Sequence, residues 1–240
     1  MSSPHSSGWQ EPNPASTRKA NREQSPCRAL LAGVLREPVT AHYVVCALAA
    51  DPAPDDDPIR DVHTRLVATC EQPVPAALTR RSGTILIPGL RHIDQAPPGL
   101  ITAPLTATWV PATAPTVPAC AELAHELLDL AVRVRPGPGI FGTRDLALEY
   151  QITRPGPGRD HLARLLTPLD PHPELLDTVR EYLRLEHGRL ATGRALGVHP
   201  NTVTNRLDKA GQLIGLDPTR LESLWQLRAA VLVRRFLGIG

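Results

Sequence analysis

A tight turn between two short helical patterns constrains the fold of this sequence more than any other feature. Gly197 can adopt the positive φ that such a turn needs without steric cost. The helical pattern before it, roughly 190–196, is short and carries small side chains, where another helix can approach closely. After the turn, His199-Pro200 predicts the start of a helix, because proline is tolerated at the first helical position and restricts the residue before it. The segment therefore predicts a helix-turn-helix unit.

The helix after the turn has an apolar side and a polar side. Val203 and Leu207 lie one turn apart and are predicted to face inward. The polar side suits DNA, since asparagine can bond adenine, arginine can bond guanine, and threonine can bond a base edge or touch a thymine methyl group. The helix N-terminus favours phosphate, and Lys209 is placed further along for the DNA backbone. The candidate DNA-binding residues are His199, Asn201, Thr202, Thr204, Asn205, Arg206 and Lys209.

A three-helix bundle with a merely solvated polar face is the simpler alternative. A solvated face more often carries pairs of glutamate and lysine, so we favour DNA binding for this series of asparagine, threonine and arginine. Residues 173–240 hold ten Arg or Lys and seven Asp or Glu, a net charge of +3. One copy is therefore expected to bind phosphate modestly and in a salt-sensitive way. Two copies on a dyad would bind better, so we expect a homodimer or higher homo-oligomer.

Further helices are predicted on both sides of this unit. One begins at Pro173 with a leucine-rich stripe, and Gly188 is its predicted C-terminal cap. Another begins at Asp217-Pro218 and closes the bundle or contributes to a dimer interface. Arg234 and Arg235 near its end could contact phosphate, but we expect them to be solvated.

The sequence before residue 168 predicts a mixture of strands and helices. Residues 1–27 are polar and predict a disordered tail. Arg-Pro-Gly-Pro-Gly occurs at 135–139 and again at 154–158, and we interpret both copies as turns. A phosphate-binding loop would need a Gly-Lys pair, which the chain lacks. The other predicted elements are a helix at 28–36, a strand at 42–50, a helix at 59–70, a hairpin of 76–81 with 83–88, a strand region at 100–110, a helix at 118–133 and a strand at 145–152.

Composition argues against several other classes of protein. The cysteines stand singly, and the histidines lack metal-ligand spacing, so we expect neither a metal nor a cofactor. Asp55-Asp56-Asp57 could attract a cation, but a solvated loop is favoured; Ser82 and Ser223 have no evident catalytic partner. No apolar run is long enough for a membrane span or a signal peptide, which predicts a cytoplasmic protein that does not contact membranes. The single cysteines are Cys27, Cys46, Cys70 and Cys120, and the histidines that stand isolated from one another are His63, His92, His125, His161, His172 and His187.

The C-terminal motifs resemble the helix-turn-helix domain of PucR/CdaR-type bacterial transcriptional regulators. The resemblance runs from Pro168-Leu169 through Leu176-Asp177-Thr178, 195–203 and Arg206-Leu207 to Gly215-Leu216-Asp217. It implies a Fis-like fold in which the helix starting at His199-Pro200 reads the major groove. The chain departs from the family at Thr204 and Asn205, where a basic and an aromatic residue are usual, so a single copy is expected to bind weakly.

Residues 39–166 resemble, more faintly, the degenerate GGDEF-like domain found ahead of this unit. The Gly-Gly-Asp/Glu-Glu-Phe signature is absent, so the resemblance implies a regulatory or dimerising domain rather than an enzyme. The expected fold is α+β, with a disordered tail at 1–27, a GGDEF-like α/β sandwich at 28–167 and an all-α Fis-like domain at 168–240. Two alternatives remain: a divergent nucleotide-handling enzyme domain, and an adaptor whose helical domain no longer binds DNA. For a regulator of this type, the sequence does not identify the effector.

Overall fold

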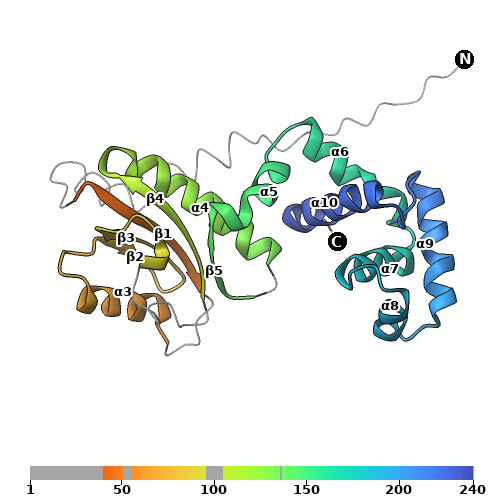
Figure 1. Ribbon diagram of the computed structural model, residues 1–240, viewed down its shortest axis with the longest axis horizontal. Helices are drawn as coiled ribbons and strands as arrows, with labels where there is room; N and C mark the ends of the chain where they lie inside the picture. Colours follow the sequence, from red (N-terminus) through yellow and green to blue (C-terminus); the bar gives the residue numbers. More distant parts are fainter. Residues whose placement is uncertain (1–39, 51–55, 96–104, 136, 240) are drawn as a thin grey trace, which may run out of the picture.

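The computed structural model describes residues 40–50, 56–95, 105–135 and 137–239. A five-stranded sheet with flanking helices is followed by a helical region (Figure 1), so the expected α+β class is confirmed. The tail predicted at 1–27 and the helix predicted at 28–36 lie outside the described residues. Among the residues described, no helix is long and apolar enough to span a bilayer.

The sheet has the strand order β2-β3-β1-β4-β5. β1 lies between β3 and β4 and is antiparallel to both, whereas β5 is parallel to β4. The predicted strand at 42–50 and the predicted hairpin are confirmed, since β2 pairs antiparallel with β3. The strands are β1 (His42–Ala50), β2 (Ala76–Leu78), β3 (Ser82–Pro88), β4 (Leu105–Thr113) and β5 (Gly139–Gly142).

Both faces of the sheet are covered by helices. α4 (Val117–Val134) packs on one face, where Val45 and Leu86 belong to its apolar cluster. α3 (Pro58–Thr69) packs on the opposite face over Val44. Alternate residues of β1 point to opposite faces of the sheet, so a strand covered on both sides reads as one dense apolar run. The two helices predicted at 59–70 and 118–133 are therefore confirmed.

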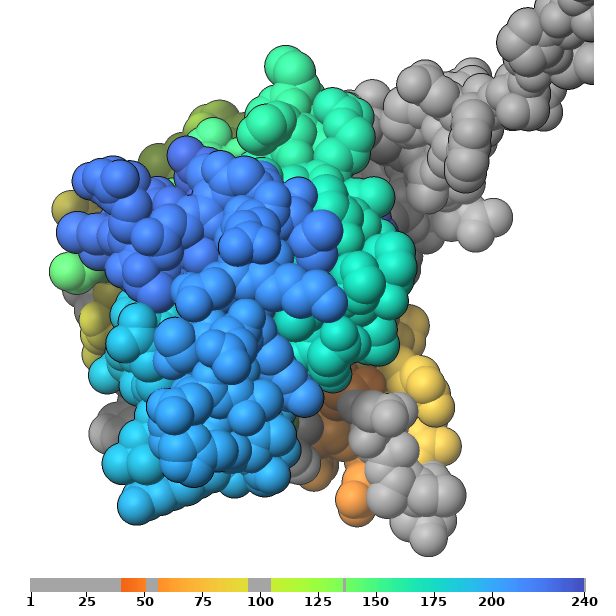
Figure 2. Space-filling model, turned by 90° about the vertical axis from the view of Figure 1, so that its right-hand side faces the viewer, coloured from red at the N-terminus to blue at the C-terminus, as the bar shows by residue number. Residues whose placement is uncertain are grey.

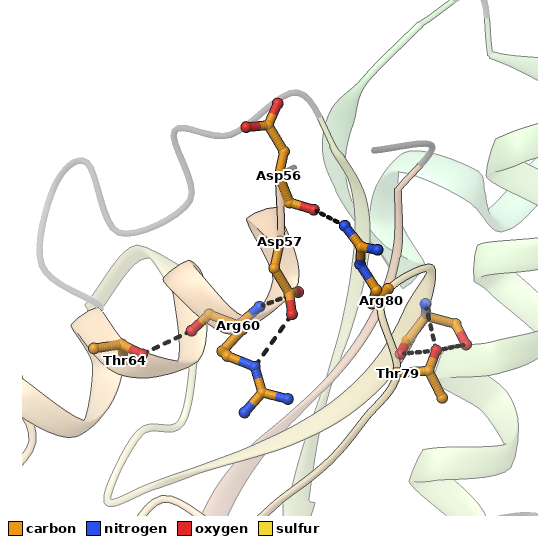
Figure 3. Close-up of polar contacts among 7 residues, drawn as sticks. Asp56, Asp57, Arg60, Thr64, Thr79 and Arg80 are labelled. Carbon is orange, nitrogen blue, oxygen red and sulfur yellow. Dashed lines mark hydrogen bonds and ion pairs between the residues drawn. The ribbon is translucent and has the colours of Figure 1, made fainter. Parts of the chain in front are cut away.

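The acidic residues predicted to form a loop before α3 make local hydrogen bonds and an ion pair (Figure 3). Asp57 accepts the backbone N–H of Arg60 at 3.2 Å and pairs with its Nε at 3.1 Å, which caps the helix N-terminus. The Asp56 carbonyl oxygen accepts a hydrogen bond from Arg80 at 3.2 Å, and Asp55 lies outside the described residues. The described residues hold no group of three or more His, Cys, Asp or Glu placed to bind a metal ion.

Cys46 lies in β1, which is covered by helices on both faces, so the reactivity of its thiol reports how well the core of the sheet is packed. Burial raises the pKa of the Cys46 thiol from 9.0 to about 12. Since the thiolate is the reactive form, we expect Cys46 to resist alkylation in the folded protein at mildly alkaline pH, while the partly exposed Cys120 reacts. Mass spectrometry of alkylated peptides, with and without denaturant, measures this difference. Equal labelling rates for both cysteines without denaturant would contradict the packing.

The same pKa shift has a defined sign for stability. The unfolded chain gives up the Cys46 proton near its ordinary pKa, whereas the folded protein keeps that proton to higher pH. The contribution of the neutral, buried thiol is thus fully present below pH 9.0 and is lost as the pH rises toward about 12.

The strand predicted at 145–152 is wrong, because α5 (Thr143–Thr153) is a helix. The Asp145 carboxylate accepts the N–H of Gly142 at 2.7 Å, which satisfies the backbone at the helix start. Only Leu146 and Thr153, two helical turns apart, are buried, while Leu148 is 60% exposed. The apolar alternation in this segment therefore did not reflect a buried strand face.

The two Pro-Gly repeats precede different elements. In the second copy, Gly156 precedes α6 (Pro157–Leu165) and Pro157 occupies its first position, so this turn leads directly into a helix. In the first copy, Gly139 opens β5, and residue 136 is not described.

The helical region has its own apolar core. Leu162, Leu165 and Leu166 pack with this core, so it includes residues ahead of 168. Val179, Val203 and Leu227 are fully buried in it and come from three different helices. After α6 and a short 3-10 turn at Thr167–Leu169, the helices are α7 (Pro173–Arg184), α8 (Arg189–Leu196), α9 (Pro200–Ile214) and α10 (Leu221–Leu237).

Two predicted helix ends are wrong. α7 ends at Arg184, and the residues with positive φ after it are Glu186 and His187; Gly188 instead precedes α8 with a φ of −82°. α10 begins at Leu221 rather than at 217–218, because Asp217 accepts hydrogen bonds from the backbone and hydroxyl of Thr219 and holds a separate turn. The hydrogen bond from the Thr219 hydroxyl lowers the pKa of Asp217 most, and the one from the Thr219 backbone lowers it further.

α10 joins the two apolar cores. Its Leu224 and Leu227 belong to the helical core, whereas Leu232 and Phe236 pack against the core of the sheet. From α4, Arg133 donates a hydrogen bond to the carbonyl oxygen of Phe236 at 3.3 Å and lies over its ring. The last helix thus closes the bundle, which is one of the two predicted roles, and also contacts the sheet domain.

The expectation that Arg234 is solvated is wrong. Arg234 is 2% exposed, and its Nη2 lies 2.6 Å from a carboxylate oxygen of Asp170. Its neighbour Arg235 is exposed. The two arginines differ because 234 falls on the packed side of α10 and 235 does not.

Candidate nucleic-acid interface

The turn between α8 and α9 is built on two glycines. Gly197 has a φ of +66° and ends α8 in the left-handed region, as predicted. Gly193 lies in α8 beside the residues that follow the turn, and its carbonyl oxygen accepts the N–H of Val198 at 2.9 Å. A Cβ on Gly193 would lie 2.7 Å from the Val198 carbonyl oxygen. The close approach predicted from the small residues of α8 is therefore confirmed at Gly193.

His199 caps the start of α9. Its Nδ1 accepts the backbone N–H of Asn201 at 3.2 Å, and Pro200 occupies the first helical position. The predicted start of the helix at His199-Pro200 is confirmed. The ring of His199 therefore helps to form the end of the helix, whose N–H groups suit an anion.

One face of α9 is fixed to the rest of the domain. Val203 and Leu207, predicted to face inward, are 0% and 1% exposed, and Ala210 continues this buried stripe. α7 packs against the same face through the shared apolar cluster. This packing holds α9 against the domain along three successive turns.

The opposite face of α9 lies at the end of the molecule (Figure 2). Asn201, Asn205 and Lys209 are exposed on it. Thr202 and Thr204 are half-buried at its edges, and the Thr204 hydroxyl donates to the carbonyl oxygen of Pro200 at 3.3 Å. Six of the seven predicted positions thus lie within α9, and the seventh is its cap.

Arg206 differs from the other candidate residues. It is half-buried, and its Nη1 donates a hydrogen bond to the Thr178 hydroxyl of α7 at 3.4 Å. The predicted outward direction is therefore only partly realised, because the side chain extends along the contact between α7 and α9.

Sequence reasoning missed two exposed residues of α9. Asp208 follows Asn205 by three positions, and Gln212 follows Asp208 by four, so they extend the exposed stripe. Helical spacing from Asn201 and Asn205 would have found both. A carboxylate at this place can accept from the amino group of cytosine but repels phosphate.

The fold and this site define a class of protein: an α+β chain that presents an exposed polar helix from a helix-turn-helix unit at its C-terminal end. Residues 175–233 match the family model of the PucR C-terminal helix-turn-helix domain, so this part of the chain is similar to that domain. The match supports a role in transcription regulation.

Other comparisons add little. The crystal structure of a regulator of polyketide synthase expression from Bifidobacterium adolescentis is 16% identical over 86% of this chain and 85% of that chain, with a TM-score of 0.37. A similarity this weak carries no argument about fold or function. No curated protein matches the sequence.

Proposed function

We propose that the protein is a sequence-specific DNA-binding transcriptional regulator whose α9 enters the major groove. The observation that carries the proposal is the exposed amide stripe of Asn201 and Asn205 on a helix held by a glycine turn and a capped N-terminus. In helix-turn-helix proteins the second helix reads base edges with its N-terminal residues. These two asparagines occupy the first two turns of α9.

Each candidate residue has its own role in this proposal. Asn201 and Asn205 read adenine, since an amide can bond its N6 and N7 atoms together. Thr202 and Thr204 border them, Lys209 neutralises a phosphate, and His199 holds the helix end where another phosphate binds. Arg206 binds guanine or a phosphate with the N–H groups that do not donate to Thr178.

The sheet domain is proposed to regulate and dimerise the protein in the manner of a GGDEF-like domain. A net charge of +3 on 173–240 supports only modest phosphate affinity for one copy. Two copies related by a dyad would contact two half-sites, so a homo-oligomer belongs to the proposal. No specific observation favours a nucleotide-handling enzyme or an adaptor.

Substituting the asparagines tests the base-reading role. After selection of a preferred duplex from a random pool, Asn201→Ala and Asn205→Ala are each expected to weaken binding to it by about tenfold, with little change on unrelated DNA. Lys209→Gln should weaken both duplexes alike and reduce the salt slope by about 1. Fluorescence anisotropy over a range of salt concentrations measures all three effects.

Gln151→Ala removes an exposed amide from α5 and serves as the matched control, with binding unchanged. The proposal fails if the 240-residue chain shows no salt-dependent retention on heparin or duplex DNA. Binding that responds equally to Gln151→Ala and Asn205→Ala would remove α9 from the interface.

A further inference from the structure

Thr178 is a buried polar residue in the middle of α7. Its side chain is fully inaccessible, and its hydroxyl donates to the carbonyl oxygen of Glu174, one turn earlier, at 2.7 Å. That bond uses the only proton of the hydroxyl, so its oxygen can still accept. Apolar packing alone would be served as well by valine, which has nearly the same shape.

The second contact of Thr178 comes from the proposed reading helix. Arg206 Nη1 donates to the Thr178 oxygen at 3.4 Å, across the contact between α7 and α9. Val203 and Leu207, which flank Arg206 on α9, are buried, so the backbone that carries the arginine is held in place. One N–H of a guanidinium with five is used in this way, and the edge formed by Nε and Nη2 keeps its donors.

We propose that Thr178 is a positioning residue that orients Arg206 for a planar pair of acceptors on DNA. A free arginine loses rotamer entropy when it forms a two-bond contact, and a side chain already held at one nitrogen loses less. The acceptor pair is either N7 and O6 of guanine or two phosphate oxygens, which share this geometry. The inference rests on the proposed function of α9 and adds a residue of α7 that does not itself contact DNA.

Two substitutions at one position separate positioning from packing. Thr178→Val removes the acceptor and keeps the shape, whereas Thr178→Ser keeps the hydroxyl. On the selected duplex, Thr178→Val is expected to weaken binding by roughly three- to tenfold, as for the loss of one hydrogen bond, and Thr178→Ser by less than about twofold. Circular dichroism melting confirms that each variant is folded at the temperature of the binding measurement.

A double-mutant cycle tests whether Thr178 acts through Arg206. If it does, Thr178→Val with Arg206→Ala binds no more weakly than Arg206→Ala alone. A duplex with 7-deazaguanine in place of guanine identifies the acceptor. If guanine is the partner, the Thr178→Val effect shrinks on that duplex, because only O6 is left to accept; if phosphate is the partner, the effect is unchanged and extends to unrelated DNA.

The outcomes separate the two proposals. Equal effects of valine and serine, or an effect of Thr178→Val that persists in the Arg206→Ala background, would overturn the positioning role. Specific binding by the wild-type protein that neither Arg206→Ala nor Thr178→Val changes would also overturn it, while the function of α9 stands. Absence of DNA binding by the wild-type protein would instead remove the proposed function.

Discussion

Replacing Gly193 with alanine is expected to reduce specific DNA binding by more than about tenfold and to destabilise the fold by about 1–3 kcal/mol. The added Cβ would lie 2.7 Å from the Val198 carbonyl oxygen and 3.4 Å from the Pro200 nitrogen, both backbone atoms. Backbone cannot rotate away as the end of a side chain can, so the start of α9 must shift. A shift of the proposed reading helix would misplace Asn201 and Asn205 together.

Gly158→Ala is the matched control for this substitution. A Cβ on Gly158 meets nothing within 4 Å, and the residue lies in the first turn of α6. Alanine there is expected to be neutral or to stabilise by up to about 1 kcal/mol. Chemical denaturation and fluorescence anisotropy on the selected duplex measure both variants. If Gly193→Ala matched the wild type in both, the turn would not be as tightly packed as described.

Replacing Arg234 with alanine is expected to destabilise the protein by about 2–4 kcal/mol, chiefly through the lost packing of a buried side chain. Its side chain is 2% exposed, and its Nη2 lies 2.6 Å from a carboxylate oxygen of Asp170, whose own side chain is 42% exposed. The substitution removes the ion pair with the partly exposed Asp170 and leaves a cavity under α10. Because α10 contacts both cores, the loss should also loosen the sheet domain from the helical region.

Arg235→Ala provides the comparison for Arg234, since it removes the neighbouring but exposed arginine. We expect its effect on the free energy of unfolding to stay within about 0.5 kcal/mol. Urea denaturation followed by circular dichroism gives both values. A similar, small effect of the two substitutions would argue against the burial of Arg234.

Two errors of sequence interpretation, the strand at 145–152 and the solvated Arg234, arise because burial depends on packing between distant segments. The segment 145–152 alternates in hydropathy, yet Leu148 is exposed, because α5 is a helix that packs against α4 and α10 and is not a strand of the sheet. Asp145 caps the start of this helix locally. In the same way, nothing local distinguishes Arg234 from Arg235. Which of the two is buried depends on how α10 lies against the other helices and on Asp170, 64 residues away in the chain.

The tight turn was determined by the sequence itself. Gly193, Gly197 and His199-Pro200 specify local backbone geometry that few other residues permit, so the positions of α8 and α9 could be predicted without the rest of the fold. The buried stripe of Val203 and Leu207 followed from helical spacing for the same reason. Only the tertiary structure decided that Arg206 lies against Thr178 and that α10 joins two cores, because side-chain partners across helices depend on packing between distant segments.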